Sequence, residues 1–146
     1  MSDPEKHTDA GSNAGAEEAE VLFSRETVNV GGEAIEVHEF TFAEGLTASV
    51  LARPIVAALD AASQSEQRDP QDFDRIIAEH KEAWLELIAL NIGKPREWIE
   101  RLPDSDGLSL SLAFWGANAG FFMKRLVLSR TMADAMAVQA RGAALR

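Results

Sequence analysis

The sequence contains no cysteine, which excludes disulfide bonds, thiolate metal sites and cysteine nucleophiles. No apolar run approaches the roughly 18 residues that a membrane span needs, and the N-terminus lacks the basic and apolar regions of a secretory signal. Positive charge is not in excess either, since the net charge is −10, and this argues against nucleic acid or an anionic membrane as a partner. These absences predict a soluble, intracellular protein.

Motifs of catalysis and of cofactor binding are also lacking. The three histidines show no HxxxH or HxxE spacing that would indicate zinc. The segment DSDG at 104–107 has no third ligand or closing Glu for calcium, and it is more typical of a helix start. Gly31-Gly32 fits neither phosphate-binding glycine motif, and no serine stands in GxSxG or SxxK. We therefore expect no enzyme, no metal site and no cofactor.

The charge is distributed unevenly along the chain. Residues 1–20 carry six acidic residues and one lysine and have almost nothing to bury, whereas residues 121–146 carry five cations and one acid. A segment that buries so little apolar surface cannot offset the entropy lost on ordering. We expect residues 1–21 to form a disordered acidic tail.

The stretch RETVNVGGEAIEVHEF predicts a β-hairpin. Val28 and Val30 alternate with polar residues before Gly31-Gly32, and Ile35 and Val37 alternate after it. A type I′ turn requires positive φ at both central residues, which a glycine pair supplies, and it places Val28 opposite Ile35. A lone two-stranded hairpin is marginal in water, so we expect it to pack on helices.

Helical spacing dominates the rest of the chain. It runs from about 43 to 63, where Pro54 predicts a break near Ala52-Arg53. Asp69-Pro70 then predicts the start of one helix of roughly six turns, on which His80 lies half-buried and which Gly93 ends. A short helix at KPREWIERLP follows, and a long one from about 105 to 130 or beyond.

These elements predict a mainly α fold with a short N-terminal β-hairpin, a small α+β helical domain. We expect a single domain over residues 22–130. Residues 131–146 are rich in alanine and have few large apolar side chains, so they form an extension that is either helical or frayed.

Residues 115–126, WGANAGFFMKRL, concentrate three aromatic side chains beside small residues. Two apolar sets can be followed along this helix: Leu108, Leu112, Trp115, Ala119, Phe122 and Leu126 in one, and Leu110, Phe114, Phe121 and Leu128 roughly opposite. A helix that is apolar on two sides is either central in a bundle or partly exposed for a partner. Because the chain offers few elements to enclose it, we favour an interface on one side. A cofactor pocket is disfavoured, since Asn118 is nearly the only polar group there.

The order of elements resembles that of the tail assembly chaperones of long-tailed bacteriophages. The resemblance covers about residues 24 to 128. The matching positions are Leu87, Leu90 and Gly93 at the end of one helix, Leu102 and Asp104 before the next, and Trp115, Asn118, Phe121 and Phe122 within the last.

The resemblance implies a non-catalytic protein that binds and solubilises the tape measure protein during tail assembly. It implies the tape measure protein as partner, with the tail tube protein and a second copy of the chain as further candidates. It also implies that the protein acts in the host cytoplasm and is absent from the mature virion. We expect Phe114, Trp115, Phe121, Phe122 and Leu126 to bind the partner, with Lys124 and Arg125 as charges at the rim.

Two other functions remain open at this stage. The protein could be a structural subunit of the virion, in the tail or at the head-tail junction, that oligomerises through its hairpin edge. It could also be an acidic inhibitor that binds a host defence complex by imitating nucleic acid. The second alternative is less favoured, because many of the acids lie in the N-terminal tail or are interspersed with Lys and Arg.

Overall fold

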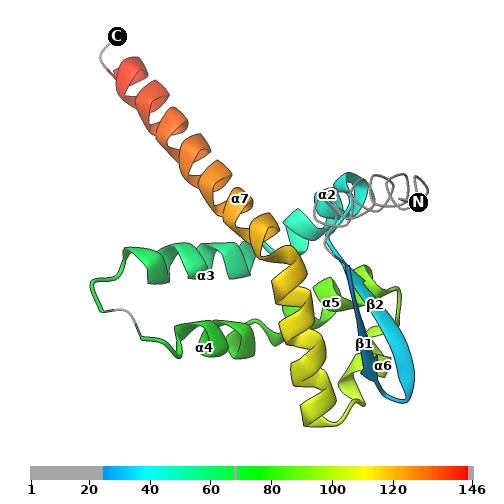
Figure 1. The fold of residues 1–146 in the computed structure, drawn as a ribbon. Helices are drawn as coiled ribbons and strands as arrows, with labels where there is room; N and C mark the ends of the chain where they lie inside the picture. Colours follow the sequence, from blue (N-terminus) through cyan, green and yellow to red (C-terminus); the bar gives the residue numbers. More distant parts are fainter. Residues whose placement is uncertain (1–24, 68, 145–146) are drawn as a thin grey trace, which may run out of the picture.

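A computed structural model of the chain describes residues 25–67 and 69–144 and shows a mainly α fold with an N-terminal β-hairpin (Figure 1). The elements are β1 (Arg25–Val30), β2 (Glu33–His38), α2 (Phe42–Leu51), α3 (Arg53–Gln64), α4 (Asp72–Glu79), α5 (Lys81–Ile92), α6 (Arg96–Glu100) and α7 (Asp104–Ala144). The expected acidic tail at residues 1–21 lies outside the described residues.

The hairpin has the register that its sequence predicted. Strands β1 and β2 are antiparallel with Val28 opposite Ile35, and the turn glycines Gly31 and Gly32 have φ angles of 59° and 77°. The turn lies against α6, because a Cβ atom on Gly31 would be 2.9 Å from a methyl group of Leu102 and 3.0 Å from the Trp98 ring. Gly31 N–H also donates a hydrogen bond of 3.0 Å to a carboxylate oxygen of Asp106, in the first turn of α7.

Helices α2 and α3 are separate, and a bend of 70° at Ala52 divides them. The break falls where Pro54 predicted it, since proline near a helix start lacks only an N–H that has no partner there. Among the described residues, no single helix is long and apolar enough to cross a membrane. Only α2 and α3 taken together as one bent span reach that length and composition.

The prediction of one six-turn helix ending at Gly93 was wrong, because the chain forms two helices that meet at His80. His80 is half-buried, as expected, but it has φ −111° and ψ 36° and leaves the helical region. The break lets α4 pack on α3 while α5 packs on α2 and β2. Gly93 does end α5, in the left-handed conformation with φ 69°.

A continuous cluster of aromatic rings forms the centre of the core. Trp84 lies 5.0 Å from Phe114 between ring centroids, Phe40 lies 5.2 Å from Phe121, and Phe73 lies 4.6 Å from Trp115. Edge-on and tilted pairs of this kind stabilise a core by about 0.5–1.5 kcal/mol each beyond the area they bury. The rings come from the segment after β2, from α4, from α5 and from α7, so the cluster joins most elements of the domain.

Two buried asparagines hold the segment that connects β2 to α2. The Asn118 side chain accepts a hydrogen bond from Phe40 N–H (2.9 Å) and donates one to the carbonyl of His38 (3.0 Å). The Asn91 side chain accepts from His38 N–H (3.2 Å) and donates to the same carbonyl (2.7 Å). The connecting backbone therefore finds its hydrogen-bond partners inside the core, as buried polar groups require, and Phe40 is placed among the rings.

We expect Gly31→Ala to lower the free energy of unfolding by about 2–4 kcal/mol, because it combines a left-handed backbone with a clash against α6. Gly32→Ala is the matched control. Its φ is also positive, but nothing lies within 4 Å of an added Cβ atom, so only the backbone cost of about 1–2 kcal/mol applies. Urea unfolding measures both. Equal losses for the two variants would contradict the packing of the turn on α6.

We expect Asn118→Ala to lower the free energy of unfolding by about 2–4 kcal/mol, because the partly buried Phe40 N–H loses its acceptor and a cavity forms at the fully buried position 118. The control is Asn29→Ala, at an exposed position of β1, for which about 0.5 kcal/mol is expected. Thermal and urea unfolding provide the comparison. A loss below 1 kcal/mol for Asn118→Ala would show that the connecting segment does not depend on this side chain.

Candidate partner-binding groove

Most of the residues expected to bind a partner lie in the core. Phe114, Phe121, Phe122 and Leu126 are buried, and Trp115 is half-buried against Phe73. The buried members of the two apolar sets of α7 lie on one broad stripe, which the hairpin, α3 and α5 cover, whereas Leu108, Leu112 and Leu128 of these sets are exposed. The side chains of Phe121 and Phe122 are therefore both inside the core. In this structure the four buried side chains offer no surface to a partner.

The two cations predicted at the rim do lie at the surface. Lys124 is exposed, and Arg125 is partly exposed with its guanidinium over the Phe121 ring, 4.7 Å from the centroid. Within the described part of the chain, Arg125 has no carboxylate close enough for an ion pair, and the same holds for Arg53. Both arginines therefore face solvent or a partner with their charge uncompensated by a close carboxylate.

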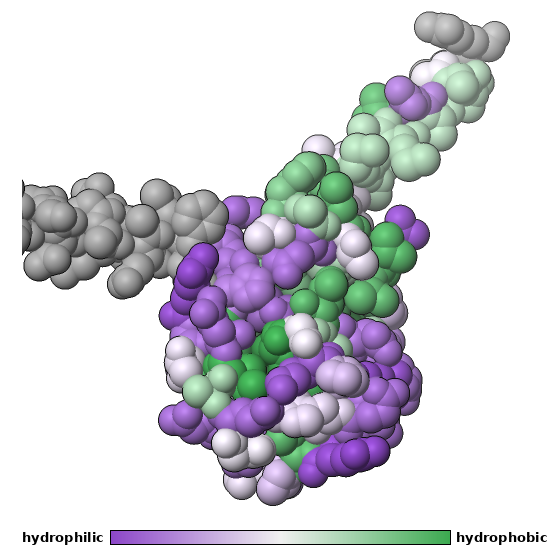
Figure 2. All heavy atoms as spheres, turned by 90° about the vertical axis from the view of Figure 1, so that its right-hand side faces the viewer, coloured by the Kyte–Doolittle hydropathy of each residue, from purple (hydrophilic) through white to green (hydrophobic). Residues whose placement is uncertain are grey.

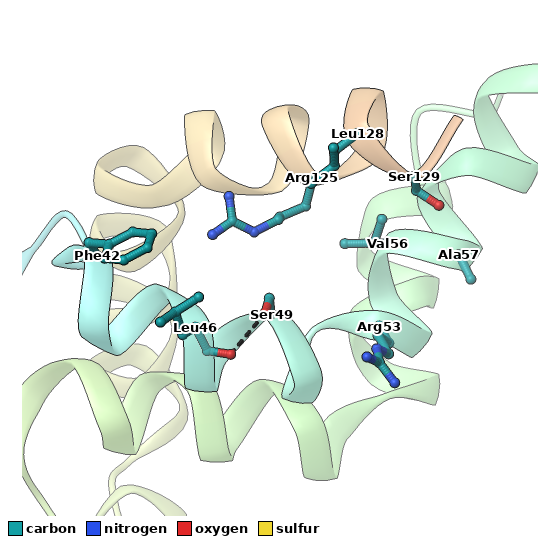
Figure 3. Close-up of a pocket in the computed structure, with 9 residues that line it drawn as sticks. All are labelled: Phe42, Leu46, Ser49, Arg53, Val56, Ala57, Arg125, Leu128 and Ser129. Carbon is teal, nitrogen blue, oxygen red and sulfur yellow. Dashed lines mark hydrogen bonds between the residues drawn. The ribbon is translucent and has the colours of Figure 1, made fainter. Parts of the chain in front are cut away.

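These two arginines border a groove between α2, the first turns of α3 and the middle of α7 (Figure 3). The groove has a volume of about 530 Å³ and is lined by Phe42, Leu46, Ser49, Arg53, Val56, Ala57, Arg125, Leu128 and Ser129. Phe42 is 80% exposed and Leu46 is 54% exposed, so two large apolar side chains of α2 stand open to solvent. An exposed apolar surface with a polar rim is typical of a site that binds another protein.

The sequence around Thr41 fixes the position of α2. The Thr41 side chain accepts from Glu44 N–H, and the Glu44 side chain accepts from Thr41 N–H, which is a complete capping box. A His38 ring nitrogen lies 3.0 Å from the same carboxylate. Burial alone would raise the pKa of Glu44, but the Thr41 hydrogen bonds and the nearby His38 outweigh it, and the pKa lies below its ordinary value of 4.5.

A small residue of α2 leaves room for side chains of α7. A Cβ atom on the buried Gly45 would lie 3.4 Å from the Arg125 guanidinium and 3.7 Å from the Phe121 ring. Ala48 and Ala52 continue this buried face. Because the small side chains of α2 face inward, its large ones, Phe42 and Leu46, face the groove.

The groove continues into an uncovered strip along α7. All described residues from Val127 to Ala144 are exposed, and this part of the helix projects from the domain (Figure 1). At 100° per residue, Met132 and Met136 lie within about 20° of Arg125 around the helix axis. We call Leu128, Met132, Met136, Ala140 and Ala143 the Met strip. Figure 2 shows hydrophobic residues around the base of the projecting helix and along it.

The groove and the strip are suited to binding rather than to acid-base chemistry. The groove lining contains no carboxylate and no imidazole, and the Ser49 hydroxyl donates to the Leu46 carbonyl. Within residues 25–67 and 69–144, no group of three or more acidic or histidine side chains could hold a metal ion. The arrangement offers apolar contact along α2 and α7 and positive charge at one end.

The sequence of the chain matches one known protein family. The family DUF6631, described as a family of unknown function, matches residues 18–145. The chain belongs to this family. No curated protein and no solved structure matches it. The DUF6631 description names no activity, so the resemblance to tail assembly chaperones stays an expectation.

Sequence reasoning missed the groove because Leu46 and Val50 fall at the same helical spacing as core residues. The exposed positions of α2 and its buried positions differ in size rather than in period: Gly45, Ala48 and Ala52 are buried, whereas Leu46 and Val50 are exposed. The signal that could have found the groove is this run of small residues at spacings of three and four, which indicates close approach to another helix.

We expect Glu44→Gln to lower the free energy of unfolding at pH 7 by about 1 kcal/mol or less. The pKa of Glu44 is lowered by folding, so its contribution is fully present above pH 4.5 and is lost as the pH falls through the folded-state pKa. The difference between wild type and variant should therefore vanish in acid. Urea unfolding between pH 3 and pH 7 (roughly the range of carboxyl titration) measures it, with the exposed Glu26→Gln as control.

Proposed function

We propose that this protein is a non-catalytic chaperone that binds and solubilises a helical segment of the tape measure protein during phage tail assembly. The observation that supports this most is the apolar groove of α2, α3 and α7, which continues along the Met strip. The proposal keeps the function implied by the resemblance and moves the binding surface from the buried aromatic residues to this groove.

An amphipathic helix is the partner that such a surface fits best. Helix-in-groove binding uses an apolar stripe on the client against a matching groove. From Arg125 to Ala143 the surface extends over 19 residues, which corresponds to about 27 Å of helix, or about five turns of a client helix. Methionine side chains are flexible and polarisable, so they adapt to clients of differing sequence.

The charges favour a client that is acidic at one end. Arg53 and Arg125 border the groove without acidic partners among the described residues, and they attract Asp or Glu of the client. The net charge of −10 keeps the complex with an apolar client soluble. In this proposal the chaperone acts in the host cytoplasm, delivers its client to the assembling tail tube protein, and is absent from the mature virion.

Co-expression with the tape measure protein of the same phage tests this function. We expect Phe42→Asp and Leu46→Asp to abolish its recovery in the soluble fraction, because each places a charge in the apolar groove. Both positions are exposed, so circular dichroism and unfolding of the isolated variants should match wild type.

Leu112→Asp is the matched control, since Leu112 is 69% exposed on α7 but does not line the groove. Full solubilisation by the groove variants would refute this binding site. Failure of the wild-type protein to solubilise the tape measure protein, or its presence in purified virions by mass spectrometry, would refute the proposed function.

A further inference from the structure

One end of the groove lies next to the place where the chain enters the described fold. Arg25, the first residue of β1, is paired with His38, and a His38 ring nitrogen lies 3.0 Å from the Glu44 carboxylate in the first turn of α2. On the adjacent Gly45, a Cβ atom would lie 3.4 Å from the Arg125 guanidinium. The part of the chain that precedes β1 is therefore attached close to this end of the groove.

The same end of the groove combines apolar surface with positive charge. Phe42 is largely exposed, and Figure 3 shows the Arg125 guanidinium pointing toward it across the groove. Within the described residues, no carboxylate lies close enough to Arg125 for an ion pair, and the groove lining contains no acidic side chain. A ligand that fits this end carries apolar side chains together with carboxylates.

The sequence immediately before β1 has this composition. Residues 17–23 read EEAEVLF, in which three glutamates precede the apolar run Val-Leu-Phe. At roughly 3.5 Å per residue, residues 17–24 can span up to about 28 Å, which is enough to pass His38 and reach Arg125. The match to DUF6631 begins at residue 18, so the family model includes nearly all of this stretch together with the folded domain.

We propose that residues 17–23 of the same chain occupy this end of the groove, with their carboxylates next to Arg125 and their apolar side chains on Phe42 and Leu46. A segment that is tethered so close to its site has an effective concentration on the order of millimolar. A weak contact is therefore sufficient to keep the groove occupied.

The consequence for regulation rests on the proposed function. A client helix that enters the groove must displace residues 17–23, so this segment keeps Phe42 and Leu46 covered until a client is present. The docking itself requires no client, and the isolated protein is sufficient to test it.

Cleavage of the isolated full chain by a glutamate-specific protease tests the docking, because the rate of cleavage follows the fraction of molecules in which the segment is undocked. We expect cleavage after the glutamates of residues 17–20 to be about fivefold slower than cleavage after Glu5, which lies outside the proposed contact. Arg125→Glu and Phe42→Asp should each reduce this difference to less than about twofold.

Lys124→Glu is the matched control for Arg125→Glu. It makes the same change of charge at an adjacent, exposed position of α7, but Lys124 does not line the groove, so slow cleavage should persist. The exposed Leu112→Asp is the control for Phe42→Asp, and circular dichroism checks that each variant is folded.

Equal cleavage at the two sites of the wild-type protein would overturn the proposal. Slow cleavage that both groove variants leave unchanged would also overturn it, because steric shielding by the folded domain does not depend on Arg125 or Phe42. Slow cleavage that disappears on about tenfold dilution would place the segment in the groove of a second copy and overturn docking within one chain.

The complex with the tape measure protein separates this proposal from the proposed function. In that complex, residues 17–20 should be cleaved as fast as Glu5, and slow cleavage that persists would overturn displacement by the client while leaving solubilisation intact. Conversely, a wild-type protein that shows Arg125-dependent slow cleavage but does not solubilise the tape measure protein would refute the proposed function and support the docking.

Discussion

The hydrogen bonds of two buried asparagines to the backbone of His38 and Phe40 are the constraint on which the rest of the domain depends. Asn91 comes from α5 and Asn118 from α7, and both bind the carbonyl of His38. An unpaired backbone group at this depth would cost about 1–3 kcal/mol. The connecting segment therefore has one favourable path, which directs the hairpin to one side and α2 to the other.

This path decides where apolar surface is left uncovered. With Phe40 fixed among the rings, α2 starts at Phe42, packs on α5, and meets the Phe121 and Arg125 side chains of α7 at Gly45. The buried part of α7 ends at Leu126, and the described contacts of its side chains with α3 end at Arg130, which pairs with Asp60. The groove lies at this boundary, where the packed part of one helix passes into its projecting part. One long helix thus contributes both to the core and to an exposed apolar groove.

The sequence predicted local features better than tertiary ones. The hairpin followed from alternation and a glycine pair, and the break before α3 followed from Pro54, because both signals act within a few residues. The break at His80 carried no glycine or proline, since it serves the packing of α4 and α5 on different neighbours. The burial of Phe114, Phe121, Phe122 and Leu126 was missed for a related reason. Helical period shows which residues share a face, but burial depends on which elements cover that face, and Phe121 and Leu46 are equally apolar in the sequence.

The continuity of α7 has a mechanical consequence. Its 41 residues make a rod of about 60 Å, with one end tied to the hairpin turn through Asp106 and the other end projecting from the domain. A tilt of about 10° around Phe114 would move the tip by about 8 Å. A contact at the C-terminal end of α7 would therefore also fix the orientation of the whole domain. Conversely, a small rotation of α7 in the core would produce a large displacement of that end.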